Sequence, residues 1–317
     1  AGALAWALRP GAPVTVEIPE GLPARQTVEL LGRKGVVVSV PLFRAYLRLT
    51  GADRRLKPGR YTFRARELPW TVLRKLTLGQ TDEIKVVIPE GFRASQIAER
   101  LAEAGVIGDA KAFESYVDDR GLEGRLFPST YLFPPGYGVP GAVRAMTQAF
   151  GAQIGAAYAK ADPKPTLSLQ DALILASIVE REAELPPERP IIAAVYLNRL
   201  KKRMPLQADP TVQYALGYWK KGLTRKDLKI PSAYNTYYRY GLPPGPICSP
   251  GLSSFEAVLH PALTDALYFV ADGRGGHIFS ETNAEQSEAA RLYKHELRKQ
   301  KEELRREERA GKAAAPR

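Results

Sequence analysis

Two short stretches in the first half of the chain alternate apolar and polar side chains with a period of two. They are VTVEI at residues 14–18 and IKVVI at residues 84–88. A strand with one buried face has this pattern. Each stretch runs into a Pro-Glu-Gly turn, apolar residues at helical spacing follow, and Gly35 or Gly105 stands where that helix should end. The pattern predicts a strand followed by a helix, twice.

An internal repeat relates these two regions. Sliding the chain by 70 residues without gaps places residues 18–21 on 88–91, and the identities continue as far as Phe63 on Phe133. In each copy a second predicted helix leads to a strand that carries a Tyr-x-Phe pair. The order strand, helix, helix, strand resembles the LysM carbohydrate-binding module in topology, with a generic small α+β unit as the alternative. Two linked copies suit a repetitive ligand such as a glycan strand.

A different kind of helix is predicted after residue 167. Ser168 is a candidate N-cap, and Asp171 completes a capping-box-like pair. The helix is apolar on most faces, yet its end, ASIVERE, carries two glutamates. At helical spacing Glu180 lies on the apolar arc that contains Leu173, whereas Glu182 points roughly 160° away. Glu180 is therefore the residue predicted to face the core.

Two interpretations of Glu180 follow from that position. Burial and the negative end of the helix dipole both disfavour an ionised carboxyl group, so its pKa should be high. A carboxylic acid that keeps its proton near neutral pH is what glycosidic cleavage needs as general acid. The alternative is a structural ion pair with a buried arginine, Arg199 or Arg203, and helix geometry alone favours this ion pair.

Polar and aromatic residues gather in two later loops. The segment PLQADPTVQYALG carries Gln207 and Asp209 in a predicted turn, and PSAYNTYYRYGLPPG packs Tyr234, Asn235 and Thr236 beside further tyrosines. Aromatic rings interleaved with amides and hydroxyls suit a cleft for sugars, because rings stack on C–H faces and sugar hydroxyls need paired donors and acceptors. A tyrosine-rich surface loop is the alternative.

Composition narrows the classes of function. The chain has 317 residues and a formal net charge of +12, which predicts attraction to nucleic acid, anionic lipid or acidic cell-wall polymers. No nucleic-acid-binding signature accompanies the charge, so no nucleic-acid partner is predicted. The single cysteine, Cys248, cannot form an intramolecular disulfide, and the three histidines lack metal-binding spacing. Neither a metal nor a cofactor is predicted.

These patterns divide the chain into predicted domains. The apolar start, AGALAWALRPG, indicates that residues 1–12 are the residual end of a removed N-terminal membrane anchor, with an ordinary frayed terminus as the alternative. The remaining divisions are a first LysM-like repeat at 13–83, a second at 84–140, a helical linker at 141–166, a catalytic domain at 167–296 and a charged C-terminal tail at 297–317. The predicted fold class is α+β, with the tandem units followed by a mixed α+β domain.

The motif series in the second half resembles that of the endolytic murein transglycosylase, or YceG-like, family. In order along the chain it reads LASIVERE, AAVYLNRL, LQADPTVQYALG, YNTYYRYGLPPGPI, SPG, HPA and LYFVADGRGGHIFS. The resemblance extends from the first repeat to about Tyr293. It implies a lyase, a lytic transglycosylase that cleaves the β-1,4 bond between N-acetylmuramic acid and N-acetylglucosamine in nascent peptidoglycan and leaves 1,6-anhydro-muramoyl ends.

The resemblance also implies site residues and a location. It assigns Glu180, the first glutamate of ASIVE-x-E, as general acid and then base, and we predict a substrate-binding cleft formed by Glu182, Gln207, Asp209, Tyr234, Asn235 and Thr236. Members are single-pass proteins of the bacterial inner (cytoplasmic) membrane, with a transmembrane anchor and an extracytoplasmic catalytic domain. The implied partners are peptidoglycan glycan strands and cell-wall synthases (penicillin-binding proteins).

Two other classes of function remain as alternatives. A non-catalytic peptidoglycan-binding scaffold would bind sacculi through the repeats and release no soluble product. A basic nucleic-acid-binding protein would show tight association that weakens steeply with salt.

Overall fold

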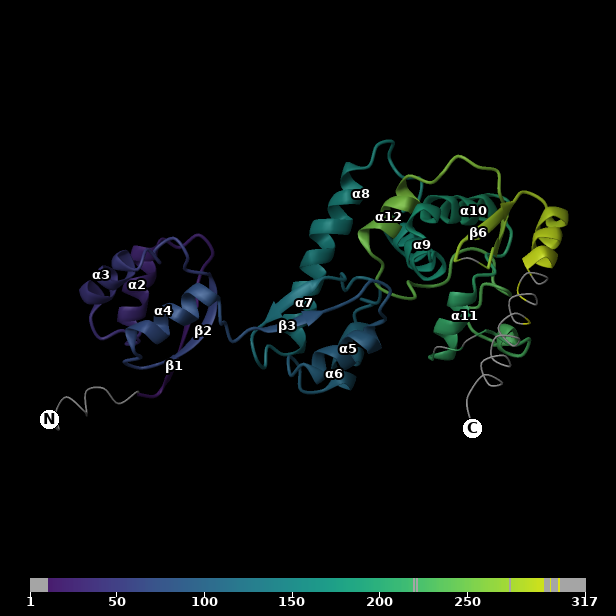
Figure 1. Cartoon of the computed structure of the whole chain (residues 1–317). Coiled ribbons are helices and arrows are strands. Elements are labelled where there is room, and N and C mark those ends of the chain that lie inside the picture. The colour runs from purple at the N-terminus through teal and green to yellow at the C-terminus, as the bar shows by residue number, and fades with distance from the viewer. Residues whose placement is uncertain are drawn as a thin grey trace, which may run out of the picture. The chain divides into compact units, whose positions relative to one another are not determined.

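The fold is α+β, as predicted. The computed structural model describes residues 11–218, 220, 222–273, 275–293, 297 and 302. Within these ranges helices predominate, and the strands form two-stranded sheets, in which β1 pairs with β2, β3 with β4 and β5 with β6 (Figure 1).

The first repeat folds into five elements around one small core. They are β1 (Pro13–Ile18), α2 (Ala24–Arg33), α3 (Val40–Leu49), β2 (Gly59–Arg64) and α4 (Pro69–Leu78). The strands are antiparallel, with Val16 opposite Tyr61, and both side chains are buried. Leu31 of α2, Phe43 of α3 and Leu76 of α4 complete the same core cluster.

The second repeat has the same order of elements. They are β3 (Ile84–Val87), α5 (Ala94–Glu103), α6 (Ala110–Asp118), β4 (Thr130–Phe133) and α7 (Val139–Phe150). The glycines that follow the first helix of each copy, Gly35 and Gly105, have φ of 72° and 74°, which confirms that they occupy left-handed positions. The predicted strand-helix-helix-strand order is present. Each copy also ends in a further helix, α4 or α7, in equivalent register, and the LysM-like description itself stays a prediction.

The rest of the chain is mainly helical. A π-helical turn (Gly151–Gly155) joins α7 to α8 (Ala156–Lys160), and the later elements are α9 (Leu169–Glu182), α10 (Arg189–Lys201), α11 (Asp209–Leu216), α12 (Leu252–Leu259), β5 (Tyr268–Ala271) and β6 (His277–Ser280). Short 3₁₀ turns lie at Pro186–Glu188 and Asp227–Lys229. Residues 283–293 are helical. β5 and β6 form an antiparallel hairpin in which Val270 pairs with Ile278.

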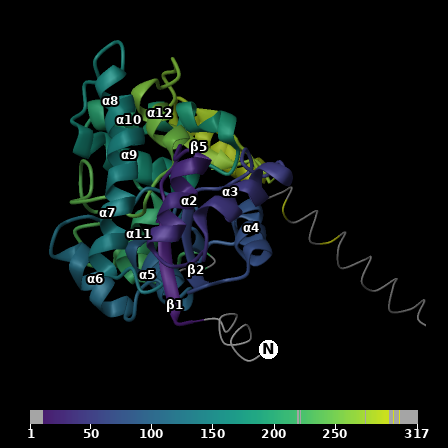
Figure 2. The same ribbon diagram turned by 90° about the vertical axis from the view of Figure 1, so that its left-hand side faces the viewer.

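Helix α9 is the centre of this part. All eight residues from Ala172 to Val179 are buried, so the helix has no solvent-facing stripe over two turns. α10 and α12 pack beside it (Figure 1, Figure 2). The predicted N-cap is confirmed, because Ser168 Oγ accepts a hydrogen bond from the backbone N–H of Asp171 at 3.1 Å. Side chains on more than one face of α9, near its C-terminal end, therefore contact other parts of the protein.

The described chain divides into two compact units. Among the described residues, the first consists of residues 11–86, 102–108 and 130–138, and the second contains the remaining segments, including all of α9 to β6. The predicted domain boundaries stay a prediction. Within the described ranges no helix combines the length and apolar character that crossing a bilayer requires. The predicted anchor remnant and charged tail lie almost wholly outside the described residues.

We expect Ser168→Ala to destabilise the protein by about 1 kcal/mol, because the variant leaves the first turn of α9 without its side-chain cap. Chemical denaturation monitored by circular dichroism measures the change. Ser253→Ala is the control, since this exposed serine lies within α12 and caps no helix. Equal destabilisation by both substitutions would contradict the assigned cap.

Candidate active site

The two glutamates at the end of α9 have different surroundings. The side chain of Glu180 is only 7% exposed, and its Oε1 lies 3.8 Å from Nη2 of Arg189, the first residue of α10. Its Oε2 accepts a hydrogen bond from the backbone N–H of Gly251 at 3.0 Å. Glu180 therefore holds together the end of α9, the start of α10 and the residue before α12.

A turn of the second repeat packs against the same end of α9. The backbone N–H of Gly91 donates to Ser249 O at 2.9 Å, and the N–H of Ser249 donates to Phe92 O at 2.8 Å. The carboxyl group of Glu90 lies so close to Gly251 that a Cβ atom there would collide with it. Burial at this contact, together with the negative charge of Glu180, raises the pKa of Glu90. The repeat thus contributes a second carboxyl group to the surroundings of Glu180.

The predicted ion-pair partners of Glu180 were wrong. The arginine beside its carboxylate is Arg189, not Arg199 or Arg203. Arg199 is directed instead to backbone carbonyls, because its Nε donates to Leu267 O at 2.6 Å and its Nη1 to Leu206 O at 2.7 Å. Of the two predicted partners, Arg199 is buried and Arg203 is exposed. Helix geometry indicated that Glu180 would face the core, but it could not identify which arginine would lie beside it.

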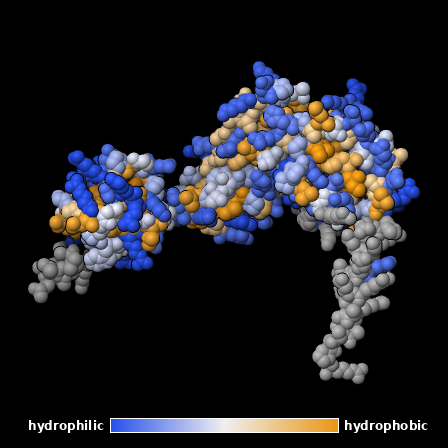
Figure 3. All heavy atoms as spheres, turned by 45° about the horizontal axis from the view of Figure 1, so that its top comes forward, coloured by the Kyte–Doolittle hydropathy of each residue, from blue (hydrophilic) through white to orange (hydrophobic). Residues whose placement is uncertain are grey.

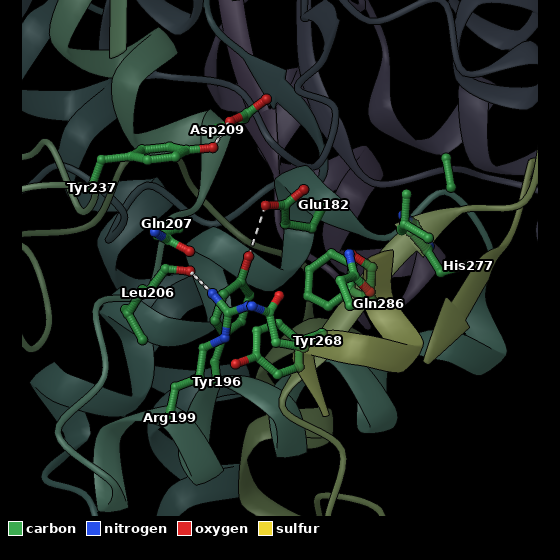
Figure 4. Close-up of a pocket in the computed structure, with 14 residues that line it drawn as sticks. Glu182, Tyr196, Arg199, Leu206, Gln207, Asp209, Tyr237, Tyr268, His277 and Gln286 are labelled. Atoms are coloured by element: carbon green, nitrogen blue, oxygen red, sulfur yellow. Dashed lines mark hydrogen bonds between the residues drawn. The ribbon is translucent and has the colours of Figure 1, made fainter. Parts of the chain in front are cut away.

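Glu182 lies in a cavity of about 390 Å³ that Glu180 does not line (Figure 4). The cavity is formed by the end of α9, one face of α10, the segment before α11 and the β5–β6 hairpin. Its polar lining consists of Glu182, Tyr196, Arg199, Gln207, Asp209, Tyr237, Tyr268, His277, Asn283 and Gln286. These residues come from segments that are far apart in sequence, and the fold brings them to one hollow.

The Glu182 carboxyl group is poised to hold a proton near neutral pH. Its Oε1 accepts a hydrogen bond from the Tyr196 hydroxyl at 2.7 Å. Desolvation by burial raises its pKa to about 7, and the negative charge of Asp209 acts in the same direction. The Tyr196 hydrogen bond and the positive charges of His277 and Arg199 oppose this rise. Desolvation outweighs them, so the acid and its conjugate base are both populated near pH 7.

Asp209 supplies a second carboxylate to the cavity. It is the first residue of α11, and the Tyr237 hydroxyl donates a hydrogen bond to its Oδ1 at 2.6 Å. Gln207, two residues earlier, has a φ of 51°. This left-handed backbone is unusual for a residue other than glycine, and strained positions of this kind cluster at functional sites. Both side chains are exposed and can meet a ligand that enters the cavity.

Arg199 places a positive charge at the base of the cavity. The residue is 7% exposed, and burial lowers the pKa of its guanidinium. Its guanidinium also lies 5.3 Å from the centre of the Tyr268 ring. Because Arg199 donates hydrogen bonds to the backbone carbonyls of Pro205, Leu206 and Leu267, it fixes the Pro205–Leu206 turn and the start of β5 in relation to α10.

His277 has a carboxylate partner outside the cavity. Its Nδ1 lies 2.7 Å from Glu188 Oε2, and its backbone N–H donates to Glu188 Oε1 at 2.8 Å. The Phe269 ring meets the imidazole edge to face at 5.2 Å. Glu188 therefore sets the orientation of a histidine that lines the same cavity as Glu182.

The predicted cleft residues divide into two groups. Glu182, Gln207 and Asp209 come together in the cavity. Asn235 and Thr236 are buried and bond to the protein: Asn235 Nδ2 donates to Leu228 O and Ile230 O, and Thr236 Oγ1 accepts from the N–H of Ala208. Tyr234 packs its ring against Tyr214 at 4.7 Å. The latter three hold the loops in place and do not line the cavity.

The sequence patterns do not indicate Tyr196, Tyr268, His277 or Gln286 as site residues, and they indicate Arg199 only as an ion-pair partner of Glu180. Tyr196 and Arg199 lie in the motif AAVYLNRL, and Tyr268 and His277 lie in LYFVADGRGGHIFS. These motifs indicate the family but assign no role to single residues. Tyr196 and Arg199 are three residues apart on α10 and so lie on one helix face. This spacing indicates that both side chains can reach the same site.

Comparison with known proteins agrees with the motif series. The model of the YceG-like family matches residues 16–292. The chain belongs to the YceG-like family. Within this family, a protein of Bacillus subtilis (strain 168) named endolytic murein transglycosylase is 33% identical over 306 residues, which cover 88% of this chain and 84% of that protein.

Two further relatives extend the comparison. A Streptococcus pneumoniae serotype 2 (strain D39) protein, also named endolytic murein transglycosylase, is 30% identical over 86% of this chain and 56% of its own length. The crystal structure of a yceG-like protein from Listeria monocytogenes is similar with a TM-score of 0.58 and 34% identity, covering 87% of this chain and 98% of that one.

We expect the Glu182 carboxyl group to titrate near pH 7 and its midpoint to rise in Tyr196→Phe, because this substitution removes a hydrogen bond that lowers its pKa. Carbon-13 NMR of glutamate carboxyl groups measures the midpoint, and Glu182→Gln identifies the resonance. Tyr240→Phe, at an exposed tyrosine, is the control. A midpoint near the ordinary glutamate value of about 4.3 would contradict the described surroundings.

Proposed function

We propose that this protein is an endolytic murein transglycosylase, a lyase that cleaves peptidoglycan glycan strands. The relatives' names and their coverage of this chain support the class of reaction. The observation that carries the chemistry is the cavity in which Glu182, with a pKa raised to about 7, lies beside Gln207 and Asp209.

The proposed reaction needs one proton donor that later becomes a proton acceptor. The carboxyl group protonates the oxygen that joins N-acetylmuramic acid to N-acetylglucosamine, and the β-1,4 bond breaks at the muramoyl C1. An oxocarbenium-like state develops. The C6 hydroxyl oxygen then bonds to C1, and its proton passes to the carboxylate, which restores the acid. No water is consumed, and the product ends in a 1,6-anhydro ring. A group with a pKa near the working pH suits both steps.

Of the two glutamates, the surroundings favour Glu182 as this group. It lines a cavity large enough for part of a glycan strand, and its pKa is raised to about 7. Glu180 makes contacts to Gly251 and Arg189 that stabilise the end of α9. The assignment of Glu180 from the family resemblance stays a prediction, and the two roles are separable by substitution.

Other cavity residues have complementary parts in the proposal. Asp209, held by Tyr237, faces the positive charge that develops on the sugar ring. Tyr196 fixes one oxygen of Glu182 and leaves the other for the glycosidic oxygen. Gln207 is exposed at the cavity and can bond to the N-acetyl group or a hydroxyl. Their contribution is positioning, in which small displacements reduce the rate strongly.

A hydrolase is the second candidate within the enzyme class. Glu182 and Asp209 place two carboxyl groups in one cavity, as hydrolysis by the common routes requires. The relatives' names favour the transglycosylase. A non-catalytic scaffold remains the alternative outside the enzyme class. We also propose, from the family resemblance, an extracytoplasmic site of action, a membrane anchor in the full-length protein and cell-wall synthases as partners.

Glu182→Gln should lower the rate of glycan cleavage by about 10³-fold, because the amide cannot donate and recover the proton. Glu180→Gln should keep activity within about tenfold, since an amide oxygen can still accept the hydrogen bond from Gly251. The measurement is release of anhydro-muramoyl products from uncrosslinked glycan strands, followed by mass spectrometry.

Thermal unfolding of both variants serves as the control for folding. Loss of activity in Glu180→Gln, with Glu182→Gln unaffected, would reverse the assignment in favour of the residue that the resemblance indicates. Full activity in both variants would sink the proposed mechanism, and binding of sacculi without any product from the unsubstituted chain would favour the scaffold.

The kcat/KM value should be high below pH 7 and fall about tenfold per pH unit above it. The pKa of Glu182 is raised to about 7, so the protonated acid predominates below that pH and is depleted above it. Initial rates from pH 5 to 9 on a soluble glycan strand measure the profile. A rate that keeps rising from pH 7 to 9 is incompatible with Glu182 as the acid.

A further inference from the structure

Helix α3 of the first repeat has two apolar faces. Phe43 and Leu47 are 2% exposed and belong to the core of the repeat. Leu42 and Leu49, on the other side of the helix, are 74% and 87% exposed. They are seven residues apart and therefore lie on one stripe. A helix at the edge of a small core needs only one apolar face, so the second stripe requires a separate explanation.

The exposed stripe continues onto neighbouring segments. Leu42, Val38 and Trp70 line one groove of about 380 Å³, which also contains the side chains of Phe43 and Tyr46. Val38 is 78% exposed and Trp70, on α4, is 59% exposed. We call Val38, Leu42, Leu49 and Trp70 the outer patch. In Figure 3 apolar atoms interrupt the hydrophilic surface of the part of the chain that carries α2 to α4.

The internal repeat provides a test of whether the fold needs the outer patch. The core residues Phe43 and Leu47 correspond, 70 positions later, to Phe113 and Val117, which are also buried. The four residues of the outer patch correspond to Gly108, Ala112, Asp119 and Pro140. The second copy therefore has the same order of elements without large apolar side chains at these positions. The outer patch is therefore a feature of the first copy, and the order of elements that the two copies share does not depend on it.

Basic residues accompany the outer patch. Lys34 precedes the Gly35–Val38 segment, Arg66 donates its backbone N–H to Gly35 O, and Arg74 lies one helical turn after Trp70. All three side chains are exposed. Two of these three cations are absent from the second copy, in which Ala104 and Gly136 correspond to Lys34 and Arg66.

The charge of the first copy as a whole has the same sign. Residues 11–86 contain fourteen Lys and Arg against seven Asp and Glu, a net charge of +7 out of +12 for the whole chain. Less than a quarter of the residues thus carries more than half of the net charge. A surface of leucine and tryptophan beside exposed lysine and arginine is typical of proteins that bind the interface of an anionic bilayer.

We propose that the outer patch docks the first repeat on the surface of an anionic lipid bilayer. Trp70, Leu42, Leu49 and Val38 enter the headgroup region, where the amphipathic indole of tryptophan is favoured. Lys34, Arg66 and Arg74 face the lipid phosphates. Contact of this kind lies on the membrane surface and does not require a spanning helix, and it is independent of the proposed catalytic function.

The test is co-sedimentation of the full chain with vesicles, either of phosphatidylcholine alone or with about 30% phosphatidylglycerol, at low and moderate salt. We expect binding to the anionic vesicles that weakens with salt. Leu42→Ser combined with Trp70→Ser should weaken this binding about tenfold or more, because two large apolar side chains no longer leave water on docking. Neither substitution changes the charge.

Leu263→Ser combined with Leu292→Ser is the matched control, since these leucines are exposed outside the first repeat, and it should bind like the unsubstituted chain. Circular dichroism checks that both variants fold. Equal vesicle binding by the patch variant and the unsubstituted chain would overturn the proposal. So would self-association in solution that the patch substitutions abolish while vesicle binding persists, because a second copy of the chain would then be the occupant.

Discussion

The arrangement of this protein depends on the burial of the middle of α9, from Ala172 to Val179. Eight consecutive buried residues leave these two turns without a solvent face, and both acidic residues at the following end of the helix enter surroundings in which an ionised carboxylate is costly. The fold resolves the two cases differently. Glu180 gains a backbone donor, Gly251, and a nearby guanidinium, Arg189. Glu182 accepts a hydrogen bond from the Tyr196 hydroxyl and lines the cavity, and burial raises its pKa to about 7.

The tandem repeats show how one sequence unit can be specialised at its surface. Both copies share core positions and left-handed glycines, but different residues are placed on the surface of each copy. In the second copy the Pro-Glu-Gly turn pairs by backbone hydrogen bonds with the segment before α12, and Glu90 packs against Gly251. In the first copy the corresponding Glu20 is exposed, and apolar residues gather instead on α3 and α4.

Features encoded over short distances could be predicted from sequence. The Ser168 cap and the different directions of Glu180 and Glu182 follow from spacing along one helix. The repeat and the α+β class follow from comparing short patterns along the chain. The cavity could not be predicted, because it joins α9, α10, the Gln207 turn and the β5–β6 hairpin, which begins only at Tyr268. Helical periodicity takes account of one buried face only, so it indicated that Glu182 points away from the core and gave no sign that a cavity lies on that side. Composition also could not distinguish the polar residues that meet solvent from Asn235 and Thr236, which bond within the loops.

The central claim is that a single carboxyl group in this cavity cleaves the glycan strand without water. Mass spectrometry of the products formed from glycan strands in water enriched in oxygen-18 tests it most directly. The account predicts anhydro-ended products that carry no label and are lighter by one water than hydrolytic products. Reducing ends that contain oxygen-18 would show that Glu182 and Asp209 act together as a hydrolase and would contradict the account.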